Sequence, residues 1–506
     1  MSSWFRRWPL HLFVAAVYPV LALLANNISQ VKASAALRPL FIVVCAALLL
    51  WGLLLLILRD VRRSALLASW WLVLFFAYGH VYNFLEVHTL LGRHRLLLPL
   101  WVGLALAGTW LILRKVRDLG YVTLVVNTIG LVLLVFPLLQ LGVYAYRSHT
   151  VAGNPSHLPP ELASLHVPPG ETPPDVYYII LDAYSRADVL KSFFGYDNTE
   201  FLNALRQKGF YVADCSQSNY AQTELSLSTS LNMDYLDSLL GALPVDSQDR
   251  VPVDGLLDLN AVRRAFKNMG YSFVSFETGF LFTQFEDADV YLYPGRLGGL
   301  SGFEVLLVKT TGGLALVDAA AKLPKFFEEG LHTPERTRYT QVNYTLDQLE
   351  HIPTWLSGPK FVFAHIVAPH TPLVFSADGS LVHYPEALDV ATYKRGYADE
   401  VAYLNQRVLA ILDQILAESP TPPIIIIQGD HGHDLASPDD RMNILNAYYL
   451  PGGGEGLLYP TITPVNSFRV VFDRYFGGNL DLLKDRSFFS YYQKPFDFKY
   501  IPNPCK

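Results

Sequence analysis

The chain of 506 residues has few cysteines, and its first 147 residues have few acidic side chains. Three acidic residues precede Ser148, against thirteen lysines and arginines, so this part carries a net charge of +10. The whole chain carries −6, which leaves −16 (−6 minus +10) for residues 148–506. An acidic C-terminal part without basic runs argues against nucleic acid as a partner, because phosphate contacts need clustered Lys and Arg.

The three cysteines have no zinc-type spacing, which argues against a cysteine-ligated structural zinc. Cys45 lies in an apolar run and is expected to pack there. Cys215 and Cys505 fall in the acidic part of the chain, and they could pair if that part lies outside the cytoplasm.

Long apolar runs fill the first 147 residues, each near the roughly 20 residues that span a hydrocarbon core. The expected spans are 8–26, 39–58, 64–85, 96–113 and 119–146. The run at 39–58 contains no charge, which buried helices of soluble proteins rarely achieve. The sequence therefore predicts a bundle of about five transmembrane helices over residues 1–147.

Basic residues in the short loops predict the orientation of these spans. Eight lie on the side that holds the N-terminus and the loops after the second and fourth spans, and five lie on the other side. The richer side is expected to be cytoplasmic. An odd number of spans then places residues 148–506 outside the cytoplasm, in a multi-pass inner (cell) membrane protein.

Residues 148–174 are rich in Pro, Gly, Ser and His and predict an extracytoplasmic linker. Beyond them, buried strands at 176–181, 361–367 and 423–428 alternate with helical patterns such as 392–417. This alternation predicts an α/β domain over 175–506, with a mainly parallel sheet flanked by helices.

Carboxylates and imidazoles follow these strands, and active sites of such sheets lie beyond the carboxyl ends of the strands. Each residue taken alone could be a cap or a loop residue, but together they favour one divalent ion, zinc or manganese. The candidates are Asp182, His365, His370, Asp430, His431 and His433.

A hydroxyl-rich stretch, 218–230, leads toward a helix and offers a nucleophile. Thr223 at a helix N-terminus would feel the positive end of the helix dipole, and an adjacent cation would stabilise its alkoxide. The alternative is that Thr223 only caps the helix, while Ser226 and its neighbours pack or cap.

Taken together, these motifs resemble the alkaline-phosphatase/sulfatase superfamily over roughly residues 174–480. The motifs are the strand before Asp182, the segment Thr223–Ser226, His370 in an Ala-Pro-His-Thr-Pro run, the helix around 397–405, and Asp430-His431-Gly after an aliphatic strand. With its membrane anchor the chain looks like lipoteichoic acid synthases and lipid A phosphoethanolamine transferases.

The resemblance implies roles for particular residues. Thr223 would be the nucleophile and a metal ligand, together with Asp182, Asp430 and His431. His370 would bind the substrate phosphate or protonate a leaving group, and His433 would assist in substrate binding. No residue role is implied for His365.

Two departures from the family's pattern argue against particular activities. The chain has no Cys/Ser-x-Pro-x-Arg motif, so sulfatase activity is disfavoured, and Ala183 follows Asp182 where a two-metal site would need a second acid. Asn405 stands where many relatives have Asp.

The resulting hypothesis is a membrane-anchored phosphotransferase that moves a phospho-headgroup from a lipid to an envelope glycan or lipid. The alternatives are a phosphoester or sulfate-ester hydrolase using the same site, and a non-enzymatic envelope binding protein with a degenerate site.

Overall fold

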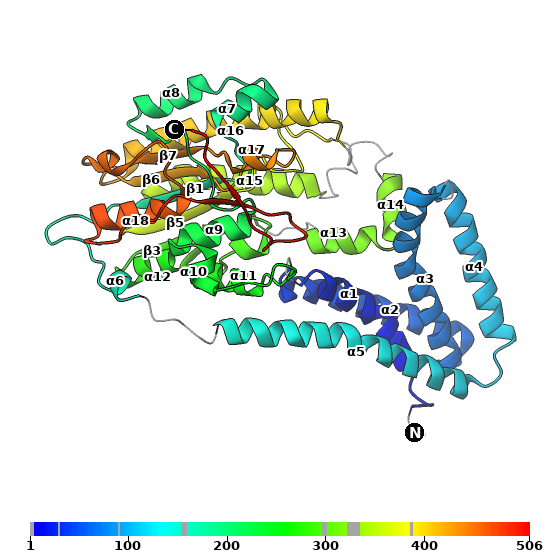
Figure 1. Ribbon diagram of the computed structural model, residues 1–506. Helices are drawn as coiled ribbons and strands as arrows, with labels where there is room; N and C mark the ends of the chain where they lie inside the picture. The colour runs from blue at the N-terminus through cyan, green and yellow to red at the C-terminus, as the bar shows by residue number, and fades with distance from the viewer. Residues whose placement is uncertain are drawn as a thin grey trace. The chain divides into compact units, whose positions relative to one another are not determined.

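The computed structural model describes residues 5–28, 31–89, 92–152, 159–295, 301–320, 334–384 and 388–505. The chain divides into two compact units. The helical unit comprises Met1–Arg147 and Leu297–Pro334, and the α/β unit comprises Ser148–Arg296 and Glu335–Lys506. Figure 1 labels the elements of both.

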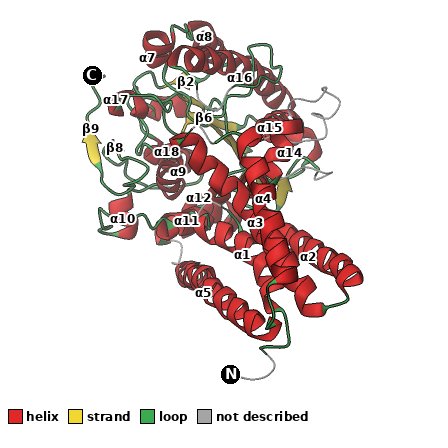
Figure 2. Cartoon of the chain, turned by 90° about the vertical axis from the view of Figure 1, so that its right-hand side faces the viewer, coloured by secondary structure: helices red, strands yellow, loops and turns green. Residues whose placement is uncertain are grey.

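The described part of the helical unit consists of helices, five from the first 152 residues and two from a later segment. They are α1 (Leu10–Asn26), α2 (Leu37–Leu58), α3 (Val61–His88), α4 (His94–Arg114), α5 (Leu119–Ala152), α13 (Gly302–Lys309) and α14 (Gly313–Ala320). Strands occur only in the described part of the other unit, as the yellow arrows of Figure 2 show.

Within the described residues, four helices are long and apolar enough to cross a membrane, not the five expected. They are Ala33–Leu58, Val61–Glu86, His94–Arg114 and Leu119–Arg147. The expected span 8–26 is a helix of 17 residues between Pro9 and Asn27. At ~1.5 Å per residue it rises about 25 Å, short of the ~30 Å hydrocarbon core.

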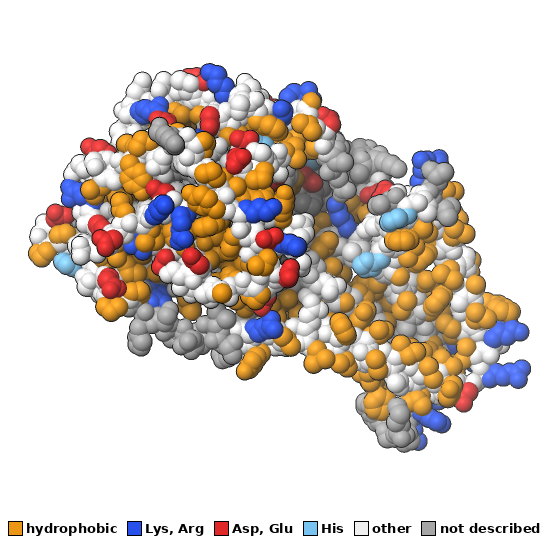
Figure 3. All heavy atoms as spheres, in the orientation of Figure 1, with side chains coloured by type: hydrophobic (Ala, Val, Ile, Leu, Met, Phe, Trp, Pro, Cys, Tyr) orange, Lys and Arg blue, Asp and Glu red, His pale blue; other side chains and the backbone are white. Residues whose placement is uncertain are grey.

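The four long helices expose large apolar side chains, as a lipid-facing surface requires. On α2, Leu56 and Ile57 are 76% and 75% exposed, and on α5 Phe136 is 80% exposed. Hydrophobic side chains cover much of the visible surface of these helices (Figure 3). We therefore treat the chain as an integral membrane protein.

Helices α13 and α14, although distant in sequence, belong to the helical unit. Phe303 and Leu307 of α13 join an apolar cluster with residues of α1, α2 and α3. Glu304 forms an ion pair with Arg38, and Asp318 lies 2.7 Å from Nε2 of His94. Residues of α13 and α14 therefore pack on the membrane helices.

The α/β unit contains a seven-stranded sheet and a two-stranded one. Its strands are β1 (Val176–Leu181), β2 (Tyr211–Val212), β3 (Ser272–Phe276), β4 (Val290–Leu292), β5 (Lys360–Ile366), β6 (Ile424–Gly429), β7 (Asn446–Tyr449), β8 (Ser487–Phe489) and β9 (Lys499–Ile501). Its helices are α6 (Pro160–Ala163), α7 (Ala187–Val189), α8 (Thr199–Gln207), α9 (Thr223–Asn232), α10 (Leu236–Leu240), α11 (Val251–Asp258), α12 (Ala261–Asn268), α15 (Pro334–Trp355), α16 (Val390–Glu418), α17 (Pro438–Met442) and α18 (Pro464–Tyr475).

The large sheet has the order β2-β7-β6-β1-β5-β3-β4 and is mixed, which corrects the expectation of a mainly parallel sheet. Strands β6, β1, β5, β3 and β4 run parallel, but β7 pairs antiparallel with β6 and with β2. A parallel neighbour needs a long crossover, usually a helix. Between β6 and β7 lies only the five-residue α17, so β7 returns antiparallel.

Alternate residues of the central strands point to opposite faces of the sheet and contribute to two hydrophobic cores, one on each face. Ile179, Ile425 and Ile427 pack with α8, α15 and α16. Tyr178, Ile424 and other residues of the same strands pack with α9, α12 and α18 on the opposite face. Helices thus cover both faces, and the continuous apolar runs of β1 and β6 follow from this double burial.

The α/β unit contains a disulfide between Cys215 and Cys505, whose Cα atoms lie 5.6 Å apart. Disulfides persist in oxidising compartments, so this bond is consistent with a location outside the cytoplasm. Of the expected linker 148–174, residues 153–158 lie outside the described residues. Nearer the sheet, Leu162 and Leu165 are buried in the second core, so this stretch packs on the unit.

Candidate active site

The register of the central strands brings the sequence-distant acids together. Leu181 of β1 lies opposite Gly429 of β6 and Ile366 of β5. Asp182 and Asp430 are the next residues of β1 and β6, so both carboxylates project from the same edge of the sheet. Both residues are fully buried.

Three electron-pair donors converge at this edge. One ligand atom from each of Asp182, Asp430 and His431 lies within 4.8 Å of the others. Nε2 of His431 lies 3.4 Å from Oδ2 of Asp430 and 3.7 Å from Oδ1 of Asp182. Neither carboxylate oxygen has a hydrogen-bond partner among the described residues. Buried anionic oxygens without donors are costly, and a cation would satisfy them.

The protonation state of His431 is fixed by its neighbour. Its Nδ1 lies 2.8 Å from the carbonyl oxygen of Gly432. A carbonyl only accepts, so Nδ1 carries the proton and Nε2 keeps a lone pair for a metal. Burial, followed by the charge of Arg441, lowers the pKa of His431, so the ring is neutral. Two carboxylates and one imidazole suit zinc or manganese.

Each carboxylate is held by its second oxygen. Oδ1 of Asp430 accepts the N–H of Ala183 at 3.0 Å, and Ala183 has a left-handed φ of 64°. Oδ2 of Asp182 accepts from Nε2 of His365 at 3.2 Å. Burial opposes ionisation of Asp182, but the histidines around it, His370 first, lower its pKa overall. His365, to which the sequence analysis assigned no role, thus orients Asp182.

Thr223 is the first residue of α9 and is 9% exposed. Its Oγ1 lies 3.0 Å from Nε2 of His431. Ser226, one turn later, donates its hydroxyl to the carbonyl oxygen of Asp430 at 2.8 Å, which ties α9 to the end of β6. The hydroxyl of Thr223 therefore lies beside the candidate metal ligands and at the positive end of a helix dipole.

Arg441, which the sequence analysis did not single out, also reaches this cluster. Its Nη2 lies 3.4 Å from Nε2 of His431, and its Nε donates to the carbonyl oxygen of Ala221 at 3.0 Å. A Cβ on Gly432 would lie 2.8 Å from the carbonyl oxygen of Asp440. Glycine at 432 therefore allows α17, which carries Arg441, to approach this closely.

A chain of hydrogen bonds connects Arg441 to His370. Arg441 donates to Oδ1 of Asp434 at 2.9 Å, and Oδ2 of Asp434 accepts the hydroxyl of Thr371 at 2.7 Å. Nδ1 of His370 donates to the carbonyl oxygen of Thr371 at 2.6 Å, which leaves Nε2 free of that bond. The rings of His370 and His431 have centroids 6.3 Å apart, so His370 borders the cluster.

His433 lies apart from the candidate ligands. Its ring is buried among aromatic residues, with centroids 4.4 Å from Phe193 and 4.7 Å from Phe194. Neither ring nitrogen has a hydrogen-bond partner among the described residues. Burial lowers the pKa of His433 to about 4, so it carries no charge near neutral pH. The geometry thus brings together Asp182, Thr223, Asp430, His431 and His370, but not His433.

No family model matches the chain, and no curated protein matches it in sequence. Solved structures similar to it include phosphoethanolamine transferases. One is the integral membrane lipooligosaccharide phosphoethanolamine transferase A (EptA) from Neisseria meningitidis, at 13% identity over 90% of this chain and 89% of that one (TM-score 0.36). Another is the periplasmic domain of EptC from Campylobacter jejuni, at 11% over 58% and 87% (TM-score 0.34).

The zinc complex of the C-terminal periplasmic domain of EcEptC from Escherichia coli is also similar. It has 13% identity over 68% of this chain and 96% of that one, with a TM-score of 0.46. These likenesses are too distant to assign a role to any residue, so the roles of the residues rest on the geometry described above.

Proposed function

We propose that this chain is a membrane-anchored, metal-dependent phosphotransferase whose α/β unit lies outside the cytoplasm. It moves a phospho-headgroup from a lipid donor to an envelope glycan or lipid. The observation that carries the proposal is the hydroxyl of Thr223, 3.0 Å from Nε2 of His431, together with two buried carboxylate oxygens, Oδ1 of Asp182 and Oδ2 of Asp430, that have no donor among the described residues.

Basic residues support the orientation. Six lysines and arginines lie in the loops after α2 and α4 or in the helix ends beside these loops, which favours the cytoplasm for both loops. Since α5 leads from the second of these loops to the α/β unit, that unit lies on the opposite side. The disulfide in the α/β unit supports the same placement. The direction of α5 through the membrane is the same whether or not α1 crosses it.

The proposed transfer has two steps, and the residues of the site have separate roles in them. Thr223 releases its hydroxyl proton to solvent, Oγ1 attacks phosphorus, and the bond between phosphorus and the lipid oxygen breaks. Nε2 of His370, when protonated, gives its proton to the departing oxygen. In the second step an acceptor hydroxyl attacks phosphorus and passes its proton to the now neutral Nε2 of His370, while the bond between phosphorus and Oγ1 breaks and Thr223 leaves as the alkoxide. A divalent ion held by Asp182, Asp430, His431 and Thr223 would lower the pKa of the Thr223 hydroxyl and neutralise charge on the phosphoryl oxygens.

The proposal is tested by trapping the covalent intermediate. The full chain, incubated with envelope phospholipids and quenched in acid, is digested and analysed by mass spectrometry. We expect a phospho-headgroup adduct on Thr223. A hydrolase would instead turn over an aryl phosphate in detergent without any lipid, and a binding protein would show neither adduct nor turnover. Absence of the adduct with metal bound and lipid consumed would contradict the Thr223 mechanism.

Arg441 is expected to bind the transferred phosphoryl group. A guanidinium can donate two parallel hydrogen bonds to phosphate oxygens. Nη2 of Arg441 lies 3.4 Å from Nε2 of His431, the same atom that lies 3.0 Å from Oγ1 of Thr223. Replacing Arg441 by Gln should lower kcat/KM by about 10²-fold, the cost of one donor to developing charge. Arg441→Lys should recover part of this loss.

Steady-state kinetics of the full chain checks this prediction, with Arg395→Gln as control. Arg395 is an exposed residue of α16, and its side chain bonds only to Thr392 among the described residues. Equal kcat/KM for Arg441→Gln and the control would rule out a role in phosphate binding.

A further inference from the structure

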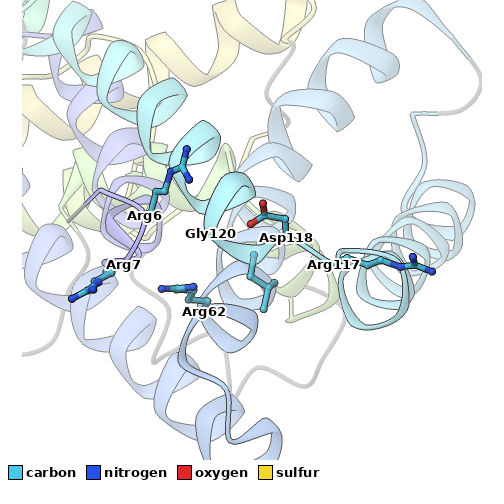
Figure 4. Close-up of a pocket in the computed structure, with 7 residues that line it drawn as sticks. Arg6, Arg7, Arg62, Arg117, Asp118 and Gly120 are labelled. Carbon is cyan, nitrogen blue, oxygen red and sulfur yellow. The ribbon is translucent and has the colours of Figure 1, made fainter. Parts of the chain in front are cut away.

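The helical unit contains a cationic cavity that the proposed reaction does not use. Its volume is about 690 Å³. It is lined by Arg6, Arg7, Arg62, Arg117, Asp118, Leu119 and Gly120. Figure 4 shows these residues around the first turn of α5. The four arginines come from three separate segments: the N-terminal segment, the start of α3, and the loop between α4 and α5. In Figure 4 the side chain of Arg117 points away from those of Arg6, Arg7 and Arg62.

The four guanidinium groups have no anionic partner in the described part of the chain. None of them lies within ion-pair distance of a described carboxylate. Asp118 is the one acid that lines the cavity, and its Oδ1 already accepts the N–H of Tyr121 at 2.9 Å. The lining therefore carries a net charge of +3 (four arginines minus one aspartate).

The arginines are held in place by polar contacts around them. Asn127 of α5 is fully buried and fixes the N-terminal segment. Its Nδ2 donates to the carbonyl oxygens of Phe5 at 3.0 Å and Trp8 at 2.8 Å, and its Oδ1 accepts the N–H of His11 at 2.7 Å. Arg6 and Arg7 lie between these anchors, so their position is part of the fold.

The start of α3 is fixed in a similar way. Oδ1 of Asp60 accepts the N–H groups of Arg62 and Arg63 at 3.0 Å, which caps the helix and sets Arg62 in its first turn. Helix α5 also begins at this cavity, and the N-terminal ends of α3 and α5 add partial positive charge to that of the arginines.

The preference for basic loops in membrane proteins does not by itself explain the cavity. Arg59 lies three residues before Arg62, and Arg114 is the last residue of α4, three residues before Arg117, yet neither Arg59 nor Arg114 lines the cavity. A preference for basic residues at this end of the helices therefore does not require that they line a common cavity. Arginines of the N-terminal segment and of α3 line the same cavity. Guanidinium groups donate to phosphate oxygens, and basic pockets at the ends of transmembrane helices suit anionic headgroups.

We propose that this cavity binds the phosphate group of an anionic molecule, either a phospholipid headgroup or a soluble phosphate compound. The apolar side chain of Leu119 in the lining and the exposed Trp8 nearby suit the amphipathic border of a lipid headgroup. The proposal is independent of the phosphotransfer reaction, because the site lies entirely within the helical unit.

The test is native mass spectrometry of the full chain in detergent, titrated with phosphatidylglycerol or phosphatidylcholine. We expect one phosphatidylglycerol to be retained in preference to phosphatidylcholine. Arg62→Gln/Arg117→Gln and Arg6→Gln/Arg7→Gln should each weaken retention about tenfold or more, since each arginine near an anionic headgroup contributes appreciably. The matched control Arg59→Gln/Arg114→Gln removes the same charge at the same end of the helices and should retain the lipid.

Competition identifies the source of the ligand. Displacement of phosphatidylglycerol by millimolar inorganic phosphate supports the site with a soluble ligand, and resistance to it supports the lipid. Equal loss in the cavity and control variants would overturn the proposal, as would equal retention of the two lipids by the unmodified chain. Arg6 and Arg7 precede the first helix, so their double variant tests the site even if the other double variant misfolds.

Discussion

Replacement of Thr223 by alanine is expected to abolish phosphotransfer, with a fall in kcat of about 10³-fold or more. Oγ1 of Thr223 is the one hydroxyl oxygen that the described structure places at 3.0 Å from Nε2 of His431. Without it no phosphorus–oxygen bond to the protein can form, and residual turnover would come from water alone. Thr223→Ser keeps an oxygen at this position and should retain measurable transfer.

The control for this variant lies on the same helix. Thr229 is also buried, but its hydroxyl donates only to the carbonyl oxygens of Leu225 and Ser226 within α9. Thr229→Ala therefore removes a hydroxyl of the same kind from the same helix without touching the site. Transfer is measured with a fluorescent phospholipid donor, and the mass adduct is sought in parallel. Full activity of Thr223→Ala would show that another group accepts the phosphoryl group.

Metal content distinguishes a lost nucleophile from a lost site. Three candidate ligands remain in Thr223→Ala, so it should still bind zinc or manganese, with affinity lowered but measurable. An inactive variant that also lacks metal would instead point to a collapsed site. Elemental analysis of the purified variant therefore accompanies the kinetics.

The proximity of the candidate ligands could be predicted from the sequence, because the carboxyl ends of parallel strands lie at a common edge of the sheet. Asp182 and Asp430 each follow a continuous apolar run, and the register of β1 and β6 sets them side by side. Thr223 could be proposed because a hydroxyl-rich stretch precedes a helical pattern. Both patterns are local in the sequence, so they can be recognised without knowledge of the rest of the fold.

Other parts of the site depend on contacts that no local pattern encodes. Arg441 lies ten residues after His431, on a five-residue helix, and reaches it only because Gly432 lets that helix approach. His433 follows the same motif, yet Phe193 and Phe194, distant in sequence, enclose it. The mixed sheet was missed for a related reason, since β7 has four residues and β2 has two.

Neutralising one candidate ligand is the second change with a large expected effect. In Asp430→Asn, Oδ1 can still accept the N–H of Ala183 at 3.0 Å, so the backbone contact persists. The other oxygen, which has no donor among the described residues, is replaced by an amide that loses the charge and turns N–H groups toward the ion. We expect metal affinity to fall more than about 100-fold, beyond the loss seen when an outer partner is removed.

Activity should fall with the metal, by about 10³-fold or more, and excess metal should restore only part of it. Isothermal titration with zinc and with manganese measures the affinity, and a thermal scan follows stabilisation by the ion. Adding metal should raise the Tm of the unmodified chain but leave that of Asp430→Asn nearly unchanged, because only binding to the folded state stabilises it.

Glu400 provides the matched control. It is fully buried in α16, and Oε1 accepts the N–H of Phe375 at 3.0 Å. Burial raises the pKa of Glu400 to about 8, so this side chain is mostly protonated at pH 7. Glu400→Gln therefore replaces a neutral acid by a neutral amide, and it should bind metal and turn over substrate like the unmodified chain.

Without metal, the difference in stability between the unmodified chain and Asp430→Asn should disappear or reverse. Without an ion, Asp182 and Asp430 place two buried carboxylates beside the same lone pair of His431. Removing one charge relieves that repulsion, so metal-free Asp430→Asn should be at least as stable as the metal-free unmodified chain. A variant that is less stable without metal, yet binds zinc with undiminished affinity, would show that Asp430 supports the fold and is no metal ligand.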